Sequence, residues 1–89
     1  MISRILIVKG KVQGVFFRRE TKKMATILGI CGVVKNEENG DVYIEAEGDS
    51  AMVFRLIDYC HHGPEGASVK NVSILLGEVK NYSTFEIIS

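Results

Sequence analysis

The residues most suited to chemistry lie in the stretch "GKVQGVFFRRE", residues 10–20, where two glycines precede two phenylalanines and two arginines. Arginine is unfavourable at the start of a helix, because the unpaired backbone N–H groups there carry a partial positive charge. The stretch contains no Ser, Thr, Asp or Asn whose side-chain oxygen would cap these groups. An anion would satisfy both the N–H groups and the arginines, so the stretch predicts an anion site.

Phosphate is the anion that this pattern fits best. A glycine-containing loop between a strand and a helix presents successive backbone N–H groups to phosphate oxygens, and the helix dipole adds to the attraction. Gly14 would allow the close approach, and the planar guanidinium of Arg18 binds two phosphate oxygens at once. Arg19 is rotated by about 100° around the helix and is expected at the surface, with a minor role in attracting anions. Phe16 and Phe17 are expected to anchor the loop and to fill the core.

The elements on either side of this loop follow from hydrophobic periodicity. The run "RILIV", residues 4–8, predicts a strand that ends at Lys9-Gly10, and the apolar spacing from Phe17 to Leu28 predicts a helix that stops at Gly29. Residues 32–48 predict two strands joined by a tight turn at Asn39-Gly40. In the second of these strands, alternation predicts one buried and one wet face. The buried set is Val42, Ile44 and Ala46, and the wet set is Tyr43, Glu45 and Glu47.

The second half of the chain predicts a second helix followed by two more strands. A helix is expected from Asp49 or Ser50, either of which can cap it, to a stop at Gly63-Pro64. Its apolar stripe consists of Met52, Val53, Leu56, Ile57 and Cys60. One strand within residues 68–79 and a short strand within 83–89 follow. This order predicts an α+β fold, a ferredoxin-like two-layer sandwich with two helices on one face of a mainly antiparallel sheet.

Length and charge narrow the functional classes. The 89 residues, 46% of them hydrophobic, suffice for one domain over residues 1–89. Eleven basic and eleven acidic side chains balance, which disfavours nucleic acid or an anionic membrane as a partner. The first apolar run is too short for a secretory signal. We therefore expect a cytoplasmic monomer that binds any anion at a local site.

Cysteine and histidine give no strong metal or redox signal. Cys31 and Cys60 lack the close spacing of a zinc or redox pair and are expected to be inert thiols. A disulfide between them is the alternative if the protein is exported or oxidised. Cys60, His61 and His62 are consecutive, but neighbouring helical side chains diverge and rarely bind one ion together. We expect neither a metal nor a cofactor.

The sequence also resembles a known family. "GKVQGVFFR" followed by "LGICGVVKNEENGDV" is similar to the paired signatures of the acylphosphatases, and the resemblance covers nearly the whole chain. It implies metal-independent hydrolysis of the carboxyl–phosphate bond of acyl phosphates, with Arg18 binding the phosphate and Asn36 orienting the attacking water. The backbone N–H groups that bind phosphate would come from Gln13, Gly14, Val15, Phe16 and Phe17.

Two residues depart from the family pattern. Val33 stands where the family usually has an aromatic residue, which should affect packing more than chemistry. Glu37 follows Asn36 and should point away from the phosphate, because neighbouring strand residues face opposite sides.

Other functions remain as alternatives. The main one is a catalytically inactive acylphosphatase-like module that binds phosphate or another ligand. RNA readers and metal carriers share such folds, but the acidic "DVYIEAEG" and the missing cysteine pair disfavour both. A phosphatase with a cysteine nucleophile is excluded, since no cysteine lies between Met1 and Ile30.

Overall fold

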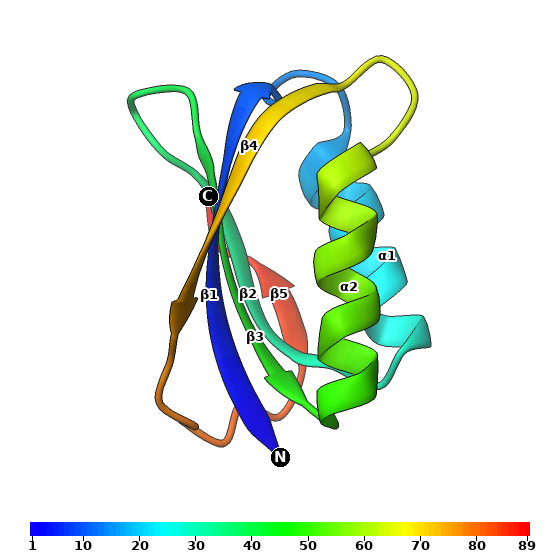
Figure 1. Ribbon diagram of the computed structural model, residues 1–89, viewed down its shortest axis with the longest axis vertical. Coiled ribbons are helices and arrows are strands. Elements are labelled where there is room, and N and C mark those ends of the chain that lie inside the picture. The colour runs from blue at the N-terminus through cyan, green and yellow to red at the C-terminus, as the bar shows by residue number, and fades with distance from the viewer.

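Seven elements follow one another in the predicted order, in a computed structural model that describes residues 1–89. They are β1 (Ile2–Lys11), α1 (Phe17–Ile27), β2 (Cys31–Asn36), β3 (Val42–Gly48), α2 (Ser50–His62), β4 (Ser68–Leu76) and β5 (Phe85–Ile87). The sheet order is β4-β1-β3-β2-β5, and only the β2–β5 pair is parallel. Both helices cover the same face of this sheet (Figure 1). The predicted ferredoxin-like α+β sandwich is confirmed.

The core fills the space between the sheet and the two helices. The largest fully buried hydrophobic side chains there are Leu6, Val8, Val12, Phe17, Val34, Val42, Ile44, Val53, Leu56 and Cys60. Asp49 caps α2, because its Oδ1 accepts a hydrogen bond of 3.0 Å from the N–H of Ala51.

Both cysteines are free thiols, and burial raises the pKa of Cys60 to about 12. Neither helix has the length and apolar character needed to cross a membrane.

Strand β1 is longer than predicted. The sequence predicted an end at Lys9-Gly10, but the strand runs from Ile2 to Lys11. It lies second in the sheet and pairs on both sides, so polar residues at its ends stay in the ladder. The register with β4 shifts between Lys9 and Gly10. Gly10 lies at this irregularity: its φ is 129°, and a Cβ there would clash with the Ser68 carbonyl oxygen.

The sheet face opposite the helices differs most from the prediction. Glu45 and Glu47 were expected in water, yet they are only 9% and 2% exposed. The cause is the segment 77–84, which joins the edge strand β4 to the edge strand β5 and must cross this face. We call residues 77–84 the crossing segment. Alternation along β3 identified which residues share a face, but it contained no information on what covers that face.

The two buried carboxylates bind the crossing segment. Glu47 accepts hydrogen bonds from the backbone N–H of Lys80, at 2.6 Å, and from that of Tyr82, at 2.7 Å. Asn81 between them has a φ of 59°, a turn conformation that lets both N–H groups face one carboxylate. Glu45 accepts from the Lys80 ammonium at 2.9 Å and from the Tyr82 hydroxyl at 3.0 Å. These bonds satisfy charges that would otherwise be costly to bury.

The stability contributed by Glu45 should depend on pH. Burial alone would raise the pKa of Glu45, but hydrogen bonds from Lys80, Tyr43 and Tyr82 outweigh it and hold that pKa below its usual value. A lowered folded-state pKa stabilises the fold above the unfolded-state pKa, and this stabilisation is lost as pH falls through the folded-state pKa. Wild type should therefore be more stable than Glu45→Gln at about pH 7, and the difference should shrink toward about pH 3.

Urea unfolding followed by circular dichroism measures this difference. Glu78→Gln is the matched control, because Glu78 lies in the same crossing segment and is exposed. The free energy of unfolding of Glu78→Gln should match that of wild type across this pH range. If the difference in free energy of unfolding between wild type and Glu45→Gln stays constant with pH, the role given to the carboxylate charge is wrong.

Candidate active site

One pocket brings together Arg18 and Asn36, which are 18 positions apart in the sequence. It has a volume of about 310 Å³ and lies where β1 ends, α1 begins and β2 ends. Its lining consists of Val12, Gly14, Phe16, Phe17, Arg18, Arg19, Asn36 and Ile87. The lining includes two arginines and no acidic side chain. The pocket is therefore suited to an anion.

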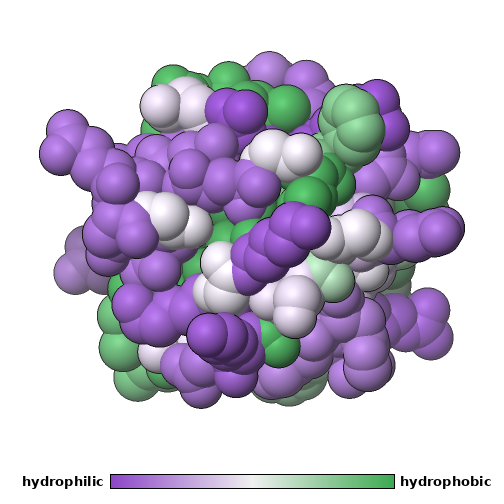
Figure 2. All heavy atoms as spheres, turned by 90° about the horizontal axis from the view of Figure 1, so that it is seen from above, coloured by the Kyte–Doolittle hydropathy of each residue, from purple (hydrophilic) through white to green (hydrophobic).

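The surface around the pocket is mostly polar. Figure 2 views the end of the molecule that carries the β1–α1 loop and the β2–β3 turn, and hydrophilic side chains dominate there with small apolar areas between them. A small charged ligand fits such a surface better than a large apolar one does.

Strand register places Asn36 on the side of the sheet that faces the helices. Asn36 pairs with Val42 and Val34 pairs with Ile44, and these valines and the isoleucine are fully buried in the core. The backbone N–H of Asn36 donates to the Ser89 carbonyl at 3.0 Å. Its side-chain Oδ1 is buried and has no hydrogen-bond partner in the chain. Because buried polar atoms are almost always satisfied, this oxygen is available to a bound molecule.

The loop before α1 supplies free backbone donors. The N–H groups of Gly14, Val15 and Phe16 donate to no other backbone group, and the N-cap residue of α1, Phe16, makes no side-chain cap hydrogen bond. The first bond of the helix runs from the N–H of Glu20 to the Phe16 carbonyl, at 3.0 Å. Gly14 has a φ of 75°, and no atom lies within 4 Å of the position that a Cβ would take. The loop therefore presents its N–H groups at an open helix N-terminus.

Arg18 adds a positive charge that no carboxylate neutralises. It is half-buried and belongs to none of the four ion pairs of the chain. Its guanidinium therefore keeps all of its donors for a ligand, and its fork geometry suits two oxygens of one phosphate group.

Arg19 and Phe16 lie at the rim of the pocket. Arg19 is at the surface, as expected: its side chain is 65% exposed, and it stacks over the Phe16 ring at 4.2 Å from its centre. Phe16 was expected to anchor the loop, but it is 65% exposed. The chain turns into α1 at Phe16 itself, with a φ of 64°. Phe17 is in the core as predicted, 1% exposed.

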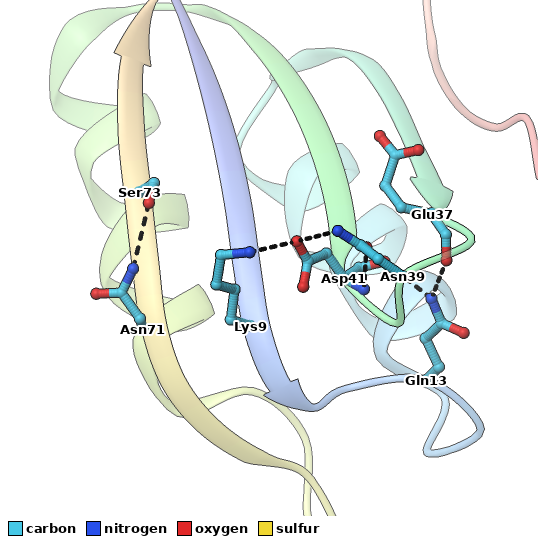
Figure 3. A network of polar contacts seen from close by, with 7 residues as sticks. All are labelled: Lys9, Gln13, Glu37, Asn39, Asp41, Asn71 and Ser73. Atoms are coloured by element: carbon cyan, nitrogen blue, oxygen red, sulfur yellow. Dashed lines mark hydrogen bonds and ion pairs between the residues drawn. The ribbon is translucent and has the colours of Figure 1, made fainter.

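Gln13 and Val15 do not line the pocket, although the resemblance placed both in the phosphate-binding loop. Val15 packs against the core. The Gln13 side chain instead donates hydrogen bonds to the carbonyls of Glu37 and Asp41 in the β2–β3 turn (Figure 3). Glu37 also lies outside the pocket: it lines a shallow hollow with Ile7, on the other face of the sheet. This agrees with its expected direction.

Sequence reasoning missed two apolar residues of the lining, Val12 and Ile87. Val12 is 1% exposed and directly follows β1, so its place after the strand was the available signal. Ile87 reaches the pocket because β5 pairs in parallel with β2, with Ile87 opposite Val34. No local sequence pattern indicates that long-range pairing.

Comparisons with known proteins agree on one family. The family model described as Acylphosphatase matches residues 4–87, a range that includes every residue of the pocket lining. A protein named acylphosphatase from Dehalococcoides mccartyi (strain CBDB1) is 47% identical over 83 residues, covering 91% of each chain. One of the same name from Archaeoglobus fulgidus is 40% identical over 87 residues, covering 98% of each chain. The crystal structure of acylphosphatase from Bacillus subtilis superposes with a TM-score of 0.97 at 29% identity, covering 100% of both chains.

Proposed function

Since this chain belongs to the acylphosphatase family and is an enzyme of that family, we propose that Arg18, Asn36 and the 13–17 loop hydrolyse acyl phosphates without a metal ion. The observation that carries this proposal is the unpartnered, buried Oδ1 of Asn36 in the same pocket as the unpaired Arg18 guanidinium. Neither a carboxylate nor a histidine lines the pocket, so its side chains are poorly suited to hold a divalent cation.

The phosphoryl group is bound by charge and by directed donors. Arg18 contacts two of its oxygens, and the N–H groups of Gly14, Val15 and Phe16 contact the others at the N-terminus of α1. Negative charge on the transferring group is spread over these oxygens in the transition state. Donors that are fixed before the reaction stabilise this charge without reorganising, which is a large source of catalysis.

Asn36 orients the attacking water. Its Oδ1 accepts a hydrogen bond from the water and holds it in line with the bond to be broken. A bond forms between the water oxygen and phosphorus while the bond from phosphorus to the carboxyl oxygen breaks, which gives a carboxylate and inorganic phosphate. An amide takes no proton at neutral pH, so the water proton passes to a phosphate oxygen. The carboxylate is a good leaving group and needs little acid assistance.

The proposal also covers the location, the oligomeric state and the partners of the enzyme. It acts as a cytoplasmic monomer on small-molecule acyl phosphates and binds neither nucleic acid nor membrane. The balance of eleven basic and eleven acidic side chains supports this, because it provides no broad field of one sign. Analytical sedimentation of the purified chain, at the concentration used for assays, tests whether the chain is a monomer.

Loss of ultraviolet absorbance of benzoyl phosphate, an aromatic acyl phosphate, tests the activity itself. With excess chelator present, wild type should hydrolyse it far faster than the uncatalysed reaction. Absence of turnover by the folded chain would contradict the proposal. If inorganic phosphate nevertheless raised the Tm of that chain, the pocket would belong to an inactive binding module.

Replacing Arg19 should change substrate capture more than chemistry. Its charge lies at the rim, with its side chain 65% exposed and its Nε 3.2 Å from Glu20. Arg19→Gln should raise KM by about threefold while kcat stays within about twofold, and added salt of about 0.5 M should remove the difference. The control Lys23→Gln, an exposed cation of α1 outside the pocket, should leave KM unchanged. A large fall in kcat would contradict the rim assignment.

A further inference from the structure

We propose that Gln13 is a positioning residue that fixes Asn36 relative to the phosphate-binding loop. The inference rests on the role proposed above for Asn36. The Gln13 side chain lies outside the pocket lining and is bonded to the β2–β3 turn, so this side chain acts on the reaction through other residues.

The Gln13 side-chain amide joins two parts of the chain that are 24 and 28 positions away. Its Nε2 donates to the Glu37 carbonyl at 2.8 Å and to the Asp41 carbonyl at 2.9 Å (Figure 3). Both partners are carbonyl oxygens, which only accept, so the amide nitrogen must face them and use both of its hydrogens. A side chain of similar length without donors cannot replace these bonds.

These two carbonyls flank the residue pair that contains Asn36. Glu37 directly follows Asn36, and Asp41 directly precedes Val42, the register partner of Asn36. The N–H of Glu37 also donates to the Asp41 carbonyl at 2.8 Å, which closes the neck of the β2–β3 turn. Gln13 therefore binds the backbone immediately next to Asn36. On the other side, Ser89 accepts from the N–H of Asn36.

Backbone pairing does not join the loop to this turn. The β1–β3 ladder ends at Val8 and Val42, and no backbone hydrogen bond connects residues 12–16 with residues 36–41. The Lys9–Asp41 ion pair, at 2.7 Å, holds the turn to β1 before the loop begins. Gln13 bridges the remaining gap, and it directly precedes Gly14, Val15 and Phe16, whose N–H groups donate to no backbone group. Gln13 is thus the side chain that joins the phosphate-binding loop directly to the backbone next to Asn36.

Gln13→Met keeps the side-chain length and removes both donors. Since displacement of a reacting group by about 1 Å can cost about 10²-fold in rate, kcat should fall at least about tenfold. KM and the inhibition constant of inorganic phosphate should change less than about threefold, because Arg18 and the loop N–H groups remain. The matched control is Asn71→Met, which removes an exposed amide that bonds Ser73 and should leave kcat unchanged. Circular dichroism at the assay temperature confirms that each variant is folded.

A double-mutant cycle separates positioning from a general loss of structure. In an Asn36→Ala background, Gln13→Met should lower kcat by less than about twofold, because the residue that it positions is already gone. If the two losses multiply, Gln13 acts independently of Asn36 and the inference is wrong. Full activity of Gln13→Met, or a loss confined to KM, would also overturn it.

A readout independent of turnover keeps the inference testable if the proposed function fails. The side-chain NH₂ signals of Asn36 in ¹⁵N–¹H NMR spectra report its surroundings directly. They should shift or broaden in Gln13→Met and stay unchanged in Asn71→Met. Unchanged Asn36 signals in Gln13→Met would refute the positioning role, whereas an inactive wild type would refute the proposed reaction.

Discussion

Arg18→Ala is expected to lower kcat/KM for benzoyl phosphate by at least about 10²-fold. Arg18 is the pocket's unpaired guanidinium, and the alanine variant leaves only the backbone N–H groups and the more distant charge of Arg19 to stabilise the phosphoryl group. No carboxylate loses a partner when Arg18 is removed, so the variant should keep its fold. Its Tm should therefore lie close to that of wild type when phosphate is absent.

Two further variants test the reason for this loss. Arg18→Lys keeps the charge but replaces a planar fork by a point charge, so its kcat/KM should lie between wild type and Arg18→Ala. Arg55→Ala removes an exposed arginine of α2 that lies outside the pocket and should have no effect. Equal losses in Arg18→Ala and Arg55→Ala would mean that net charge, and not a specific contact, attracts the substrate.

Asn36→Ala should lower kcat by at least about 10²-fold while inorganic phosphate still binds. The backbone bond of Asn36 to Ser89 and its pairing with Val42 of β3 use main-chain atoms, so alanine preserves them. The variant loses only the amide, whose buried Oδ1 has no partner in the chain. Removing an unsatisfied buried atom should not destabilise the fold, and the free energy of unfolding should stay equal or rise.

The inhibition constant of inorganic phosphate distinguishes water positioning from phosphate binding. In Asn36→Ala it should change by less than about threefold. In Asn36→Asp, a carboxylate faces the bound anion, so phosphate affinity should fall as well. A weakened phosphate affinity in Asn36→Ala, with kcat unchanged, would show that Asn36 binds the phosphoryl group and does not orient water.

Much of the fold could be predicted because its signals are local. The alternation along β3 and the Asp49 cap are each encoded by neighbouring residues. The tight turn predicted at Asn39-Gly40 is instead a longer connection over residues 37–41, in which only Gly40 has a positive φ. The burial of Glu45 and Glu47 was not predictable in this way. It depends on the crossing segment, which is more than 30 positions away along the chain.

The residues of the candidate site also differ in whether the local sequence could identify them. Arg18 and the uncapped loop were identifiable from residue types alone, since an arginine at an uncapped helix start is unfavourable without an anion. Asn36 needed the family resemblance, because an asparagine at a strand end is otherwise an ordinary turn residue. The contacts of Gln13 and the parallel pairing that brings Ile87 to the pocket arise only from the assembled sheet.

The central claim is that Asn36 directs a water onto a phosphorus atom held by Arg18 and the loop. Hydrolysis of benzoyl phosphate in ¹⁸O-labelled water, with mass spectrometry of both products, tests it most directly. The account predicts rapid turnover with the label in inorganic phosphate and none in benzoate, and a far slower reaction in Asn36→Ala. Label in benzoate would contradict it, because the water would then attack the carbonyl carbon instead of phosphorus.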